Sequence, residues 1–129
     1  MNERLLALPF NVQDASGVSA TDAAANVKVP FNVTPVGASI CLDKVSGSPT
    51  DVLVDFNDDG TEIAGFGSIS LGATAGAGAQ VKTPHLGGAV AVPAQIAKDS
   101  VISMDLKFTD GTSPKANVTG VLWVLPGEG

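Results

Sequence analysis

The stretch that decides the fold runs from Asp51 to Leu71 and reads DVLVDFNDDGTEIAGFGSISL. In its first part the apolar residues Val52, Val54 and Phe56 occupy every second position, which is the period expected of a half-buried β-strand. The next four residues, Asn57 to Gly60, tolerate positive φ angles, and a second apolar run follows at once. The stretch therefore predicts a β-hairpin.

The second arm of this hairpin contains an interruption. Ile63, Ile69 and Leu71 fall on one face of a strand, whereas Phe66 lies out of phase between two glycines. Glycine allows both a backbone kink and the close approach of a neighbouring strand. We therefore expect a bulge or bend around Phe66.

The rest of the chain carries further alternating runs and no long helical period. Besides the hairpin, the expected strands cover residues 6–12, 26–33, 36–43, 86–92, 102–108 and 118–125. In the second of these, Val29, Phe31 and Val33 are expected to share one face. About eight strands with short, turn-rich connections favour an all-β fold, an antiparallel β-sandwich of jelly-roll type.

The chain is expected to form a single domain, because 129 residues are enough for one core. Residues 1–24 are interpreted as an N-terminal strand followed by a flexible arm or linker, since Gln13 to Ala24 is small and polar. Residues 25–129 form the β-sandwich. The single cysteine, Cys41, allows no intrachain disulfide, so stability must rest on burial.

The composition is poor in charge. Hydrophobic residues make up 44% of the chain and charged residues 16%, below the roughly 25% that is usual, which predicts that part of the surface is hidden in an assembly. Seven basic and thirteen acidic residues give a net charge of -6, and the basic ones are scattered singly. Nucleic acid is therefore disfavoured as a partner. The longest uncharged run, Ile63 to Val81, is too rich in Gly, Ser, Thr and Ala for insertion into a membrane.

Few residues suggest chemistry. Asp55 to Gly60 matches the start of a calcium loop, but the twelfth position is Phe66 where a bidentate carboxylate is required. A calcium site completed by a distant carboxylate remains an alternative to an ordinary hairpin turn. His85 is the only histidine, and one His with one Cys cannot complete the usual zinc site. We expect no catalytic residues, no metal and no cofactor, and therefore no enzyme.

The last apolar run, Val118 to Leu125, has apolar residues on both faces. It is either a central strand or a strand whose outer face meets a partner. Trp123 is the only tryptophan and there is no tyrosine, so stacking on a sugar ring is less favoured than packing in a core or an interface. We expect Val121, Trp123 and Leu125 to form a subunit contact.

Three segments resemble a known family. Val52 to Ile63 resembles the hairpin of small jelly-roll modules found among virion proteins of tailed bacteriophages, with its strand, Asp-Gly-Thr turn and strand. Ile96 to Leu106 is similar to the later strand entry of these modules, and Val118 to Val124 is similar to their closing strand. The likeness spans about Val36 to Leu125.

This resemblance implies a capsid decoration or cement protein, frequently a homotrimer, that binds the major capsid protein on the outer surface of the virion. Such a protein, made in the host cytoplasm, stabilises the assembled head through many weak contacts. The N-terminal arm is the expected capsid contact, through Leu5, Leu6, Leu8 and Phe10, because a flexible segment can order on a neighbour. The alternative is a tail-fibre or spike module, or a carbohydrate- or receptor-binding β-sandwich.

Overall fold

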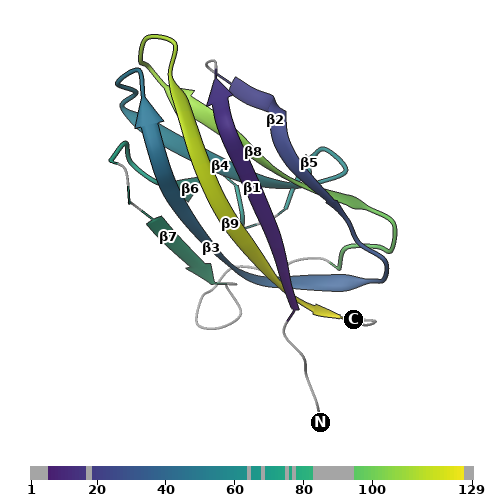
Figure 1. Ribbon diagram of the computed structural model, residues 1–129. Helices are drawn as coiled ribbons and strands as arrows, with labels where there is room; N and C mark the ends of the chain where they lie inside the picture. The colour runs from purple at the N-terminus through teal and green to yellow at the C-terminus, as the bar shows by residue number, and fades with distance from the viewer. Residues whose placement is uncertain are drawn as a thin grey trace.

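The computed structural model describes residues 6–16, 19–63, 65–67, 69–74, 76, 78–82 and 95–126. Within these residues the elements are all strands (Figure 1): β1 (Leu6–Ser16), β2 (Ser19–Lys28), β3 (Val33–Ser46), β4 (Asp51–Asp58), β5 (Thr61–Glu62), β6 (Ile69–Ser70), β7 (Gly78–Lys82), β8 (Val101–Thr109) and β9 (Lys115–Pro126). A search of the described residues finds no helix long and apolar enough to cross a membrane.

The strands form two stacked antiparallel sheets (Figure 1). One sheet has the order β1-β9-β3-β7, and the other has the order β2-β8-β4-β5 with β6 also paired to β4. The two ends of the chain pair progressively inward, because β1 pairs β9, β2 pairs β8, β3 pairs β7, and β4 pairs β5 and β6. A long hairpin rolled into two layers in this way is a jelly roll, so the expected fold class is confirmed.

The core lies between the two sheets and follows the period of the strands. Val52, Val54 and Phe56 of β4 are fully buried, and their neighbours in the sequence are more exposed. Phe10 of β1 reaches across to Phe56, and the two rings meet edge to face with centroids 5.5 Å apart. Such a pair adds directional attraction to apolar burial, so it ties one sheet to the other near the centre.

The predicted hairpin is present. Asp58 pairs with Thr61, which leaves Asp59 and Gly60 as a two-residue loop with φ angles of 50° and 87°. Two positive φ angles in succession suit the right-handed twist of the flanking strands. The expected bend in the second arm is also confirmed, because Phe66 is completely buried and its N–H donates to the Ile63 carbonyl (2.9 Å).

The expected linker is instead part of the sheets. The backbone of residues 13–16 belongs to β1 and that of residues 19–24 belongs to β2. Both strands show irregular register there, opposite β9 and β8 respectively. Backbone hydrogen bonds need no apolar side chain. Small polar residues can therefore continue a strand even where the sequence lacks the alternation that predicts one.

The expected second strand is also corrected. β2 ends at Lys28 and β3 begins at Val33, so the chain turns in between, next to Pro30, which cannot donate to a strand ladder. Val29 and Val33 are buried, but Phe31 is 41% exposed. The strand expected at residues 86–92 lies outside the described residues.

Candidate functional site

The closing strand β9 carries the residues expected at a subunit contact. Val121, Trp123 and Leu125 are half-buried and alternate with Leu122 and Val124, which are completely buried in the core. Because successive side chains of a strand point to opposite sides, the first three share the outer face of the four-stranded sheet. The structure therefore brings these residues together on one surface.

The register of the sheet adds residues from two other strands to this surface. β9 lies between β1 and β3, with Val121 opposite Pro9 and Ser39, and Thr119 opposite Asn11 and Cys41. Directly opposed residues of neighbouring strands lie on the same side of the sheet. We call the middle of this surface the neutral face, and it comprises the uncharged residues Ala7, Pro9, Asn11, Ser39, Cys41, Thr119, Val121, Trp123 and Leu125. Exposed Asp43 borders it, with Oδ1 3.9 Å from Cys41 Sγ.

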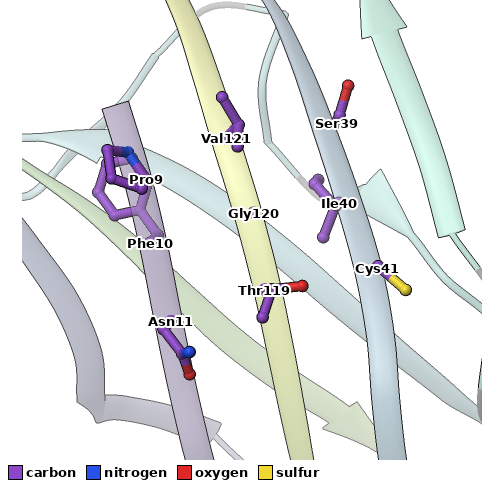
Figure 2. A pocket seen from close by; sticks show the side chains of 9 residues that line it. All are labelled: Pro9, Phe10, Asn11, Ser39, Ile40, Cys41, Thr119, Gly120 and Val121. Atoms are coloured by element: carbon purple, nitrogen blue, oxygen red, sulfur yellow. The ribbon is translucent and has the colours of Figure 1, made fainter. Parts of the chain in front are cut away.

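The neutral face contains a shallow hollow of about 760 Å³ (Figure 2). Its lining residues come from the middle of β1, β9 and β3: Pro9, Phe10, Asn11, Ser39, Ile40, Cys41, Thr119, Gly120 and Val121. Beside the hollow the Trp123 indole N–H donates to Ser39 Oγ (3.5 Å). The residues that line the hollow are apolar or small and polar, and the Asp43 carboxylate lies beside one of them, Cys41.

The opposite outer face, on the five-stranded sheet, is acidic. Asp55 of β4 lies directly opposite Asp105 of β8. Asn57 Nδ2 donates to Asp105 Oδ2 (2.8 Å), while Asp105 Oδ1 is buried without a hydrogen-bond partner. Burial raises the pKa of Asp105, hydrogen bonds from Ser103 and Asn57 lower it, and the negative charge of Asp55 raises it, with a net rise. Lys107 of β8, opposite Leu53, lies on the same face and offsets part of this negative charge.

The acidic residues near the hairpin serve the fold. Asp59 Oδ1 accepts the Val101 N–H (2.9 Å), and the Asp59 N–H donates to the Val101 carbonyl (2.8 Å). Asp51 accepts hydrogen bonds from Ser70 Oγ and the Gly72 N–H. In the described part of the chain, no three His, Cys, Asp or Glu residues are grouped so that they could hold a metal ion.

The described residues expected at a capsid contact all lie on β1. Phe10 is only 3% exposed and its ring packs in the core, so its side chain offers little surface to a partner. Leu6 and Leu8 are half-buried and pack against the same core. The reason is the period of β1, which turns its large apolar side chains inward. Leu5 and the single histidine, His85, lie outside the described residues.

Two parts of the surface do not follow from the alternation of apolar residues in the sequence. Pro9, Ser39 and Cys41 join the neutral face only through the register of strands that are distant in the sequence. Phe31 was placed on a buried face, although the Pro30 before it was a signal that the strand could end.

Comparisons with known proteins show the fold. No protein-family model matches the chain, and no curated protein matches it significantly. Among solved structures, a chain of the cyanophage Pam1 capsid asymmetric unit is similar, with a TM-score of 0.60 and 13% identity over 98% of this chain and 88% of that chain.

Two structures of infectious bursal disease virus also match. The Gx strain gives a TM-score of 0.39 with 12% identity and covers 100% of this chain, and virus-derived T=1 particles give 0.40 with 10% identity and cover 97%. This chain spans 34% and 32% of those chains, respectively. The cyanophage likeness covers nearly the whole of both chains, so this protein shares its jelly-roll fold with a chain of a viral capsid structure.

Proposed function

We propose that this protein is a non-enzymatic structural component of a virion that binds the outside of an assembled capsid and stabilises it. The observation that carries the proposal is the neutral face, because in this proposal its uncharged residues join the subunits into the oligomer that binds the capsid. Exposed apolar patches of this kind mark interaction sites. The fold shared with a chain of a cyanophage capsid structure supports a capsid as the setting.

The mechanism is mass action. A protein that binds the assembled shell, and not its free subunits, stabilises the shell by about 2.7 kcal/mol per site when its free concentration is about 100 times the Kd. A cyclic oligomer binds the shell more tightly than a monomer does, because its second and third contacts form within a complex that is already bound. In this proposal the protein is a homotrimer, and Val121, Trp123 and Leu125 lie in the contact between subunits.

The proposed contact with the major capsid protein lies at the start of β1. Leu6 and Leu8 keep part of their side chains exposed, whereas Phe10 is committed to the core. Deleting the first 24 residues is a poor test, because it removes all of β1, which pairs along β9. Leu8→Ser is a milder change, and we expect it to weaken cosedimentation with capsids that lack this protein. Val45→Ser is the control, because Val45 of β3 is also a half-buried apolar residue that packs against the core but lies outside the start of β1.

Mass spectrometry of purified virus particles tests the proposal as a whole. We expect this chain at a copy number comparable to that of the major capsid protein. A few copies per particle would favour a tail-fibre or spike module instead. Absence of the chain from purified particles would refute a virion role.

A further inference from the structure

Two connections of the jelly roll meet at one end of the sandwich (Figure 1). Residues 47–50 lead from β3 to β4, and residues 110–114 lead from β8 to β9. Each connection crosses from one sheet to the other, because β3 and β9 belong to the four-stranded sheet whereas β4 and β8 belong to the five-stranded sheet. We call residues 47–50 the first turn and residues 110–114 the second turn.

Hydrogen bonds join the two turns. The Thr112 N–H donates to the Gly47 carbonyl (2.7 Å), and the Thr50 N–H donates to the carbonyl of Thr109, the last residue of β8 (2.7 Å). The Thr50 hydroxyl also donates to Asp110 Oδ2 (3.1 Å). The pairing of β3 with β9 and of β4 with β8 therefore continues from one sheet to the other.

Each turn contains a glycine at the point where the other turn approaches most closely. A Cβ atom on Gly47 would lie 2.6 Å from the Thr112 carbonyl oxygen and 2.6 Å from Pro114 Cα. A Cβ atom on Gly111 would lie 2.9 Å from the Gly47 carbonyl oxygen and 3.0 Å from Pro49 Cα. Packing this close leaves no room for an added methyl group. A side chain at either glycine would therefore push the other turn away.

The backbone of both turns includes conformations that need support. Ser48, Asp110 and Ser113 have φ angles of 53°, 59° and 45°, in the left-handed region that costs energy for residues other than glycine. Such conformations persist only where the surrounding structure holds them. Pro49 and Pro114 are buried, although the residues on either side of each proline are exposed. The two turns thus pack against each other beneath an exposed surface.

We propose that the two turns form a single latch, in which neither turn keeps its conformation without the other. The latch prevents the two sheets from separating at this end of the sandwich unless the whole domain unfolds. An exposed turn ordinarily opens locally, because few buried contacts oppose its opening. In the latch, opening one turn breaks the hydrogen bonds and the packing of both turns, so local opening is suppressed. The inference concerns the stability of one chain and does not depend on the proposed function.

Native-state hydrogen exchange at the Thr50 and Thr112 N–H groups tests the latch in the wild-type protein. We expect both protection factors to lie within about tenfold of those of the slowest amides of β8, because exchange at all of these sites requires global unfolding. A lower protection factor at either threonine would show that the turns open on their own, and it would overturn the inference.

Alanine substitutions separate the contact between the turns from backbone strain. Gly47→Ala and Gly60→Ala add the same methyl group at nearly equal φ angles of 84° and 87°, but Gly60 has no atom of a neighbouring segment within 4 Å. Gly47→Ala should lower the protection of Thr50 and Thr112 relative to β8 by about tenfold or more. Gly60→Ala, the control, should leave that ratio unchanged.

Gly111→Ala tests whether the effect is reciprocal. It lies in the second turn, and it should lower the protection of Thr50, in the first turn, relative to β8. If the loss of protection in either variant is confined to the substituted turn, or if Gly60→Ala changes the ratio as much as Gly47→Ala does, the two turns are independent and the inference is wrong. The wild-type measurement decides the question even when an alanine variant does not fold.

Discussion

Replacing Asp105 with asparagine should stabilise the protein at neutral pH. The Asp105 carboxylate lies directly opposite that of Asp55, and its Oδ1 atom is buried without a hydrogen-bond partner. Asparagine has nearly the same shape, and its Oδ1 can still accept the hydrogen bond from Asn57 Nδ2. The substitution therefore removes a charge and keeps the packing.

The size of the effect follows from the register. Like charges directly opposed on neighbouring strands destabilise a sheet by about 0.2–1 kcal/mol. Because Asp105 is partly exposed, water screens the repulsion, and we expect a gain of about 0.5 kcal/mol. For a chain of this length that corresponds to a rise in Tm of about 2 °C.

The gain should depend on pH in a defined direction. Burial raises the pKa of Asp105 above its ordinary value, so the folded state binds this proton more tightly than the unfolded state does. At pH values above the raised pKa, the charged Asp105 carboxylate lowers the free energy of unfolding by its full amount. This destabilisation disappears as the pH falls through that pKa toward the ordinary aspartate value, because the carboxylate becomes protonated. Asp105→Asn should therefore stabilise most at pH 7 and very little under acidic conditions.

Urea unfolding at several pH values measures this effect. Glu62→Gln, at an exposed position of β5 and with the same change in net charge, is the control and should show no such gain. In a double-mutant cycle, Asp55→Asn should remove only the part of the benefit of Asp105→Asn that comes from the repulsion between the two carboxylates, and the larger part that comes from burial of the Asp105 charge should remain. A loss of stability at pH 7, or a gain of equal size at every pH, would refute the reasoning.

Three further substitutions test the core and the hairpin. Gly120→Ala places a Cβ 2.7 Å from Met104 Sδ and should cost about 1–3 kcal/mol by overpacking, with a smaller loss when Met104→Leu is combined with it. Phe56→Ala should cost about 3–5 kcal/mol in chemical denaturation, since it empties a fully buried site and removes the ring that meets Phe10. Gly60→Ala meets no atom within 4 Å but sits at a φ of 87°, so it should cost about 1 kcal/mol through backbone strain alone; a neutral result would show that the loop relaxes.

Local patterns in the sequence were enough for the strands and the hairpin. Alternation over Val52, Val54 and Phe56 and the Asp59-Gly60 turn depend on residues close together in the chain, where period and turn chemistry act directly. Alternation also predicts that Val121 and Trp123 share one face of β9, and this prediction does not depend on which strands lie beside β9.

The rest depends on contacts between distant segments. The hollow exists because β1 and β3 flank β9 in a particular register, and no local pattern specifies that register. Residues 19–24 have no apolar period, yet their backbone lies in β2. Around Phe31 the alternation of apolar residues in the sequence continues through a turn. The path of the backbone there is set by hydrogen bonds to residues 96–100. Local propensity yields to tertiary pairing at such places.

The central claim is that another copy of the chain covers the neutral face, and Cys41 reports on it directly. Cys41 is the only cysteine in the chain, it is exposed, and it lines the hollow. The rate at which a maleimide modifies it should be measured for the wild-type protein over a wide range of protein concentrations. We predict that the wild-type protein reacts roughly tenfold or more slowly at concentrations where it is assembled, because only the dissociated fraction is accessible. Equal rates at every concentration would contradict the account.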